Sequence, residues 1–139
     1  MSKAKREGAT RTADRAAQRL FDDFEIRLTR AVLHSNPKSA RALEMLGQAL
    51  TRAGRHQDAL EADLKLTVLR PNDPTAFYNL ACSYSNIDNL DAAFEALHRA
   101  FDLGYKDYQH LLKDPDLENV RKDRRFKSLL NRQWGKRQP

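Results

Sequence analysis

Two consecutive segments of the chain, residues 40–73 and 74–107, share a pattern of large and small side chains at a spacing of 34 residues. A repeat of this length accommodates two helices and a turn, and such a unit cannot bury its apolar face alone. Successive units must therefore stack, each covering its neighbour. The repeat predicts an all-α protein built from antiparallel helix hairpins. A stack of this kind favours a binding surface over a catalytic centre.

Residues typical of helix ends divide each repeat into two helices. Ser39 and Asp73 are suited to cap the start of a helix, and Pro74 fits the first helical turn. Gly54 and Gly104 are suited to end helices. The sequence thus predicts helices that begin near residues 40 and 74, each followed by a returning helix of the same hairpin.

The matched positions of the two units resemble the tetratricopeptide repeat, whose pattern is a large residue, Leu, a small residue, Tyr, a small residue, a large residue and a closing Pro. The resemblance implies a right-handed α-solenoid, and it is closer in the second unit. The positions that carry it are Leu43/Phe77, Leu46/Leu80, Gly47/Ala81, Leu50/Tyr84, Ala59/Ala93, Leu66/Ala100 and Pro71/Tyr105.

Asp63 departs from this pattern, because the family has a large or aromatic residue there and the second unit has Leu97. A carboxylate buried without a partner is costly. Two interpretations follow. Either the helix rotates so that Leu64 fills the position and Asp63 reaches solvent or an Arg, or Asp63 is buried and paired with a basic residue of the neighbouring helix.

The segments that flank the repeats are interpreted as ends of one domain over residues 14–132. Residues 14–36 form a helix that resembles half a repeat, and residues 108–132 resemble the closing segment of bacterial tetratricopeptide proteins. We expect the first helix to bury one apolar stripe, made of Leu20, Phe21, Phe24, Leu28, Ala31 and Val32. We expect the closing segment to bury Leu111, Leu117, Val120, Phe126 and Leu130.

Positive charge is concentrated at the two ends of the chain. Residues 1–20 have a net charge of +4 and residues 121–139 of +7, whereas residues 21–120 have −5. Residues 1–13 are polar and lack a periodic apolar pattern, so they are predicted to be a flexible basic tail. Residues 133–139 are interpreted as a second basic tail. The basic pI therefore does not indicate a basic groove within the repeats.

No pattern of catalytic or ligand-binding residues stands out. Cys82 is the one cysteine, the four histidines lack the spacing of metal ligands, and the glycines do not form a phosphate-binding loop. We expect no enzyme activity, no cofactor and no metal. The apolar runs are too short for a membrane span, and the N-terminal segment has no secretory pattern, so a cytoplasmic protein is expected.

The resemblance implies that the first helix of each unit lines a concave groove for a partner. Family members that clamp a terminal carboxylate have Lys and Asn at two positions that here hold Glu44/Gln48 and Tyr78/Cys82, so such a clamp is not expected. The leading hypothesis is an adaptor that binds a protein or peptide segment, with Tyr78 as its apolar anchor. The groove residues would be Arg41, Glu44, Gln48, Thr51, Arg52, Thr75, Tyr78, Cys82, Ser85 and Asn86.

Two alternatives remain. The basic ends, together with Trp134, are suited to phosphate contacts and base stacking, which would indicate association with nucleic acid or the ribosome. The first helix is also suited to form a homodimer, because half a repeat leaves an apolar edge. The basic residues of the C-terminal end are Arg121, Lys122, Arg124, Arg125, Lys127, Arg132, Lys136 and Arg137.

Overall fold

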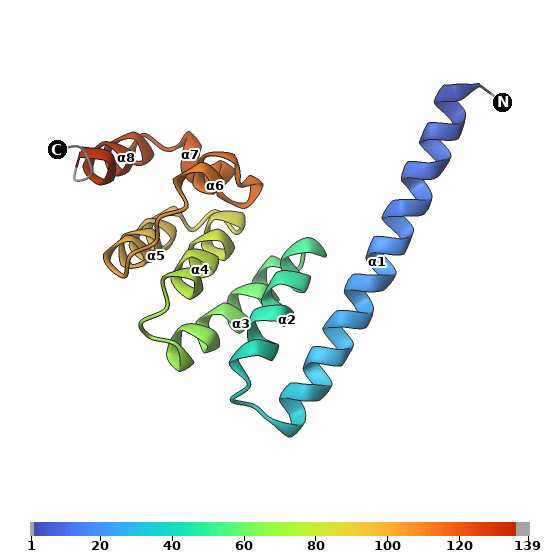
Figure 1. Ribbon diagram of the computed structural model, residues 1–139, viewed down its shortest axis with the longest axis horizontal. Helices are drawn as coiled ribbons and strands as arrows, with labels where there is room; N and C mark the ends of the chain where they lie inside the picture. The colour runs from blue at the N-terminus through green and yellow to red at the C-terminus, as the bar shows by residue number, and fades with distance from the viewer. Residues whose placement is uncertain (1, 136–139) are drawn as a thin grey trace.

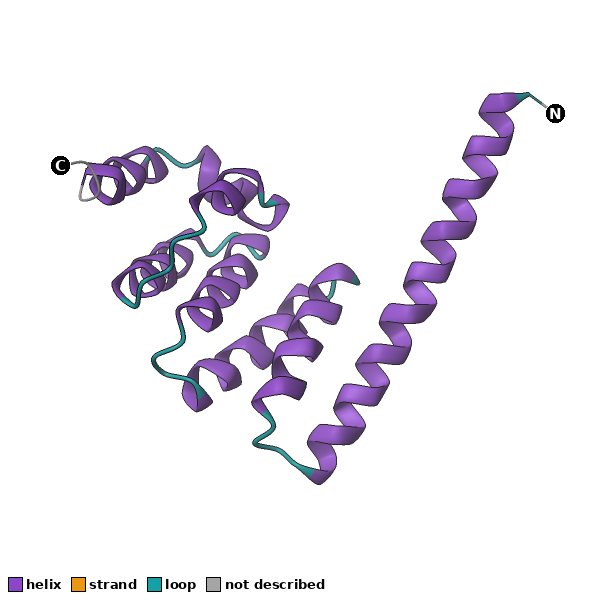
Figure 2. Cartoon of the chain, in the orientation of Figure 1, coloured by secondary structure: helices purple, strands orange, loops and turns teal. Residues whose placement is uncertain are grey.

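A computed structural model describes residues 2–135, which form helices joined by short turns, with no strand among them (Figure 2). Two antiparallel hairpins stack side by side, and a long helix flanks them at one edge (Figure 1). The predicted all-α solenoid of helix hairpins is confirmed. The elements are α1 (Lys3–Ser35), α2 (Ala40–Arg52), α3 (His56–Leu69), α4 (Pro74–Asn86), α5 (Leu90–Asp102), α6 (Tyr108–Lys113), the 3-10 helix η1 (Pro115–Leu117), α7 (Glu118–Lys122) and α8 (Arg125–Gly135).

The helix starts follow from capping side chains. The Ser39 hydroxyl accepts a hydrogen bond from the Ala42 amide at 3.2 Å, and the Asp73 carboxylate accepts one from the Thr75 amide at 2.9 Å. Gly54 follows the end of α2 with a φ of +76°, a conformation that side chains disfavour. The predicted caps thus lie where the hairpins begin and turn.

Helix α1 is longer than the sequence indicated. Residues 1–13 were predicted to form a flexible tail, but α1 begins at Lys3, and the Ser2 hydroxyl accepts a hydrogen bond from the Lys5 amide at 3.4 Å. The first turns stand away from the other helices (Figure 1). Good helix formers and the continuous backbone hydrogen bonding of α1 extend this helix without tertiary packing. Helix α8 continues to Gly135, into the segment 133–139 that was expected to be a basic tail, and residues 136–139 lie outside the described part.

The predicted buried face of α1 is wrong. The helix packs against α2 through Ile26 and Thr29, which are 2% and 3% exposed, and through the carboxylate of Asp22. The apolar stripe lies on the other side, and its larger members are 42–70% exposed. Both faces of α1 have helical periodicity. Arg52 on α2 forms an ion pair with Asp22, and this pair favours packing through the face that carries Asp22.

Residues 108–135 cover the end of the second hairpin and form the C-terminal cap. Leu111, Leu117 and Val120 are fully buried, and Phe126 is 7% exposed. These side chains share one apolar core with α4 and α5, against which the partly buried Leu130 also packs. The sequence indicated a cap here, and the buried side chains of the segment lie against the second hairpin. It closes one end of the stack by burying apolar area that the second hairpin would otherwise expose.

Within residues 2–135, no helix combines the length and the apolar character that a membrane span requires.

Candidate functional site

A concave pocket of about 350 Å³ lies between the two hairpins and the C-terminal cap. Helix α2 contributes Gln48, Thr51 and Arg52 to its wall, and α4 contributes Asn79 among others. The first helix of each hairpin therefore faces the pocket, as the family resemblance implies. The α6–η1 segment forms the remaining wall and narrows the groove that the two hairpins would form alone.

Asp63 reaches this pocket from α3 and is 4% exposed. The Ser83 hydroxyl donates a hydrogen bond to its Oδ2 atom at 2.5 Å. Burial raises the pKa of Asp63 to about 6, although the hydrogen bond from Ser83 partly opposes that shift. Asp63 is thus buried, as one interpretation of the sequence held, but its partner is a hydroxyl and not a basic residue. Leu64 points outward and is 40% exposed.

Gly47 makes room for this carboxylate. A Cβ atom at Gly47 would lie 2.6 Å from Oδ1 of Asp63, too close for two non-bonded atoms. Gly47, one of the small positions of the repeat pattern, therefore accommodates a polar side chain. The sequence signal for the buried acid is that the first unit has both Gly47 and Asp63, because the missing side chain of the glycine leaves room for the carboxylate.

Asp114, in the cap, connects three side chains on the cap side of the pocket. It is 6% exposed, and the Tyr78 hydroxyl donates a hydrogen bond to its Oδ2 atom at 2.7 Å. Nε2 of His110 lies 3.1 Å from the same oxygen, and the Cys82 thiol lies 3.7 Å away. Burial, followed by the nearby Asp114 charge, raises the pKa of the Cys82 thiol, which stays protonated and unreactive at neutral pH.

Arg52 carries a positive charge at the opposite side of the pocket, but two carboxylates of α1 engage it. Its Nε atom lies 3.1 Å from Asp22 Oδ1, and its Nη2 atom lies 2.5 Å from Glu25 Oε2. Gln18 also donates a hydrogen bond to Asp22, at 3.0 Å. Arg52 therefore fastens α1 to α2. Its charge is balanced before any ligand enters.

The structure gathers five of the ten predicted groove residues at the pocket, namely Gln48, Thr51, Arg52, Tyr78 and Cys82. Arg41 and Thr75 are exposed elsewhere, and Glu44 lies 3.3 Å from Arg70. Ser85 is fully buried, and Asn86 donates a hydrogen bond to Asp116 at 3.2 Å. The prediction treated all ten as open to a partner, whereas the second unit's positions are largely covered by the cap.

Tyr78 is the clearest correction, because it cannot act as an exposed anchor. Its side chain is 3% exposed, and its ring stacks on that of Tyr105 with the centroids 4.3 Å apart. Burial raises its pKa above the ordinary value. Tyr78 instead fastens α4 to the cap. The sequence indicated a cap over this end of the stack but did not indicate that its Asp114 would reach across the concave face of α4.

Several cations of the C-terminal end have structural roles. Arg121 donates hydrogen bonds to the backbone carbonyls of Leu111 and Asp114, at 3.1 and 2.5 Å. Arg125 pairs with Asp91 at 2.6 Å and lies over the Phe94 ring, with 4.6 Å to its centroid. Lys122 pairs with Glu118 at 3.2 Å. These contacts engage three members of the predicted basic surface with groups of the chain itself. The side chain of Trp134, and Lys136 and Arg137, lie outside the described part.

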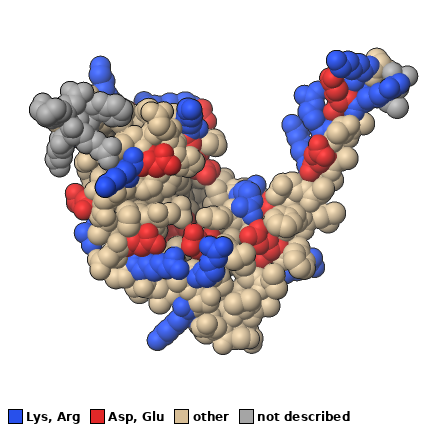
Figure 3. Space-filling model, in the orientation of Figure 1, with Lys and Arg blue, Asp and Glu red and all other residues tan. Residues whose placement is uncertain are grey.

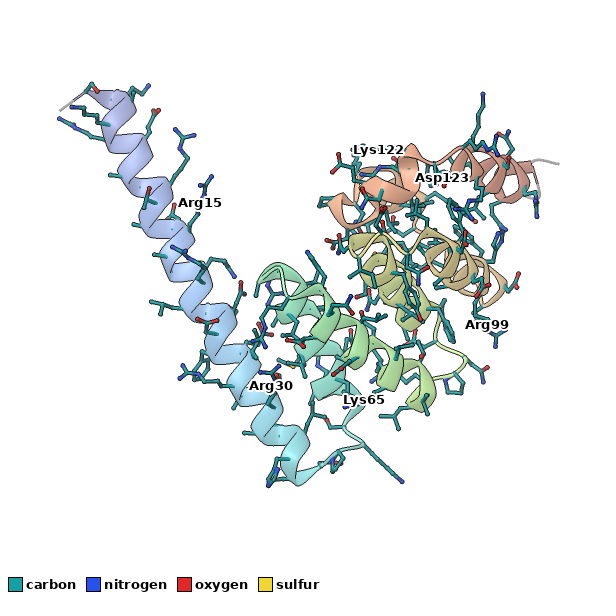
Figure 4. All side chains as sticks on the ribbon, turned by 180° about the vertical axis from the view of Figure 1, so that it is seen from behind. Arg15, Arg30, Lys65, Arg99, Lys122 and Asp123 are labelled. Atoms are coloured by element: carbon teal, nitrogen blue, oxygen red, sulfur yellow. The ribbon has the colours of Figure 1, made fainter. Side chains whose placement is uncertain are left out.

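The basic residues of the N-terminal end lie along the exposed first half of α1. Figure 3 shows Lys and Arg gathered at its free end, and Figure 4 shows Arg15 projecting from a stretch with no neighbouring helix. Acidic Glu7 and Asp14 interrupt the series. The cations therefore form a discontinuous row on one helix and not a concave basic groove.

Comparisons with known proteins agree with this architecture. The family model described as tetratricopeptide repeat matches residues 11–74, which run from α1 to the start of α4. A chloroplast protein of Arabidopsis thaliana is 31% identical over 110 residues, which cover 76% of this chain and 33% of that protein. A TPR repeat-containing protein of a Picosynechococcus species is 37% identical over 68 residues, covering 49% of this chain and 18% of that protein. The chain thus spans about a third or less of the length of these curated relatives.

Among solved structures, the crystal structure of MamA superimposes with a TM-score of 0.56 and 29% sequence identity, covering 78% of this chain and 70% of that one. The repeat spacing, the stacked hairpins and these similarities agree. The chain is a tetratricopeptide repeat protein.

Proposed function

We propose that this chain is a protein-interaction module whose concave pocket receives a lysine or arginine side chain from an extended segment of a partner protein. Tetratricopeptide stacks in general serve protein–protein interaction. The observation that carries it is Asp63, a carboxylate 4% exposed at a pocket wall, where a serine hydroxyl is the partner of one oxygen.

The charge balance of the pocket supports a cationic ligand. Asp63, Asp114 and Asp116 line the pocket, while the positive charge of Arg52 is already matched by Asp22 and Glu25. A buried carboxylate recovers part of its lost hydration when an ammonium or guanidinium group pairs with it. The pocket therefore favours a positive side chain and disfavours an acidic one.

The size of the pocket supports a side chain as the inserted group. A volume of about 350 Å³ lies near the lower limit of ligand pockets, which span roughly 300–1,000 Å³. One long side chain fits that space, while the peptide backbone would run along the exposed Gln48 and the partly exposed Thr51 of α2. The first unit thus supplies the open surface that the sequence predicted for both units.

A peptide array tests the proposal. Short peptides of random sequence are probed with the full chain, and we expect bound peptides to be enriched in Lys or Arg at one position. Acetylation of that lysine should abolish binding, because it removes the charge. Asp63→Asn should weaken binding about tenfold, as expected for one charged hydrogen bond. Asp102→Asn, an exposed carboxylate at the end of α5, is the matched control and should bind like the native chain.

The pH dependence of binding provides a second readout. Since the pKa of Asp63 is about 6, lowering the pH from 7 to 5 protonates the carboxylate and should weaken binding of the lysine peptide. The Asp63→Asn variant should lose this additional pH dependence. Selection of peptides without a basic residue, or equal losses in the Asp63 and Asp102 variants, would reject the proposed ligand chemistry.

A further inference from the structure

Helix α1 carries an apolar stripe that faces away from the rest of the molecule. Leu20 is 70% exposed, Phe21 57%, Phe24 55%, Leu28 48% and Val32 42%. The helix uses its other side, around Ile26, to pack against α2. Six apolar positions on one helix face, with the small Ala31 completing the set, form a contiguous surface that a folded chain rarely leaves in water.

The stripe is symmetric about position 26. Its members, Leu20, Phe21, Phe24, Leu28, Ala31 and Val32, follow one another at intervals of one, three, four, three and one residues. An interface between two identical copies related by a twofold axis must be self-complementary. If two α1 helices lie antiparallel and cross at the level of residue 26, Leu20 lies at the level of Val32 of the other copy, Phe21 at the level of Ala31, and Phe24 at the level of Leu28. Each large side chain then has an apolar side chain at the same level of the other stripe.

The charges beside the stripe suit the same arrangement. Asp23, Arg27 and Arg30 lie along one edge of the stripe, because their helical positions fall within about 60° of one another. In an antiparallel twofold pair, this edge meets the same edge of the other copy. Asp23 then lies within about 3 Å, along the axis, of the level of Arg27 of the second helix. Arg30 lies close to the same level but is already paired with Asp58 of its own chain, at 3.9 Å. Opposite charges would meet at both ends of the contact.

The area of the stripe is sufficient for a specific dimer. Five large side chains, each with about half of a surface of roughly 200 Å² exposed, offer about 500 Å² a copy, or about 1,000 Å² for a pair. Specific interfaces begin near this size. We propose that two copies of this chain associate through the apolar stripes of α1, antiparallel and centred at the level of residue 26. This inference is independent of the pocket, which α2, α4 and the cap line on the other side of α2.

Sedimentation equilibrium of the full chain tests the association. We expect a reversible dimer. The variant Phe21→Ser/Phe24→Ser should raise its dissociation constant by about a hundredfold or more, since each substitution removes an apolar side chain from both copies. Val68→Ser is the matched control, because Val68 on α3 is 79% exposed but stands outside the stripe. A monomeric native chain, or a dimer that both variants retain, would overturn the proposal, whatever other protein the stripe then binds.

Cysteine crosslinking tests the direction of the pair. The single variants Leu20→Cys and Val32→Cys are mixed and oxidised, and mass spectrometry identifies which cysteines are joined. Antiparallel pairing predicts the mixed disulfide between positions 20 and 32 in excess over the two symmetric ones. The native Cys82 is 7% exposed and is told apart by its own peptide. Predominance of symmetric disulfides, or crosslinking no faster than for a Val68→Cys control, would contradict the pairing.

Discussion

At the C-terminal end of the stack, the last hairpin is covered by residues 108–135, whereas at the N-terminal end α1 turns its largest apolar side chains to solvent. Leu117 and Val120 are fully buried in the cap, while Phe21 and Phe24 are more than half exposed. Both ends have amphipathic helices of ordinary composition. They differ in what covers them: the cap packs on the last hairpin, whereas no element within residues 2–135 covers the stripe of α1. The comparison shows that apolar periodicity predicts a contact surface on a helix but does not predict whether another element of the same chain covers it.

Matched leucine substitutions at the two ends should show the largest difference. Leu117→Ala leaves a cavity in the cap, and we expect it to lower the free energy of unfolding by about 2–5 kcal/mol. Leu28→Ala, on the stripe, should cost less than about 1 kcal/mol in the monomer. Urea denaturation at low protein concentration measures both. Equal losses would mean that the stripe is buried in the monomer and that the two ends do not differ.

Asp63 lies between the two ends, and its pH dependence should be the next largest effect. Its pKa of about 6 in the folded chain exceeds the ordinary value of 3.8, so the folded state binds the proton more tightly. Stability should therefore rise as the pH falls from 7 to 4, by up to about 3 kcal/mol relative to Asp63→Asn.

Hydrogen exchange shows whether the rise in stability at low pH is shared by both ends of the stack. If the stack unfolds as one unit, slow amides in α2 and in α5 should gain the same protection at low pH. A gain confined to one hairpin would show that the ends unfold separately. A native chain whose pH profile parallels that of Asp63→Asn would exclude the raised pKa.

The attachment of α1 should depend on Arg52. Arg52→Ala leaves the carboxylate of Asp22, which is 3% exposed, without its guanidinium partner, and we expect a loss of about 1–3 kcal/mol. Arg41→Ala, an exposed residue of the same helix, is the control. Limited proteolysis should cleave α1 of the Arg52 variant while the C-terminal cap stays protected. Cleavage of both ends at equal rates would argue against this local role.

A glycine substitution in the free half of α1 should have the smallest effect. A Cβ atom added at Gly8 would have no neighbouring atom within 4 Å, so Gly8→Ala should raise local helix stability by about 0.5–1 kcal/mol. The free energy of global unfolding should stay the same, because this half of α1 stands apart from the core. Circular dichroism reports the helicity. A shift of the global urea midpoint would indicate that the free half is coupled to the rest of the molecule.

The hairpins could be predicted because local residues determine them. Ser39, Asp73 and Gly54 fix where helices begin and end, and the small side chains of Ala59 and Ala93 permit close packing, each being fully buried. The cap could likewise be predicted from its apolar residues. Each of these signals acts over a few residues or within one repeat, where helix periodicity and capping suffice.

The packing face of α1 and the shape of the site depend on contacts between distant residues. Asp22 is buried because Arg52, thirty residues later, reaches it. Tyr78 is covered because Asp114, thirty-six residues later, accepts a hydrogen bond from its hydroxyl. The sequence predicted burial of another face of α1, and it placed Tyr78 in an open groove. Periodicity assigns residues to the faces of a helix, but contacts with distant segments of the chain determine which face is buried.

The C-terminal cap also determines how this array could lengthen during evolution or design. A duplicated 34-residue unit inserted after residue 73 would meet α3 before it and α4 after it, so its neighbours would resemble those of the existing units. A unit appended after Gly104 would have to displace the cap, together with the Tyr78–Asp114 hydrogen bond and the buried Leu117. A new repeat is therefore accommodated more readily between the two hairpins than after Gly104, where the cap would have to be displaced.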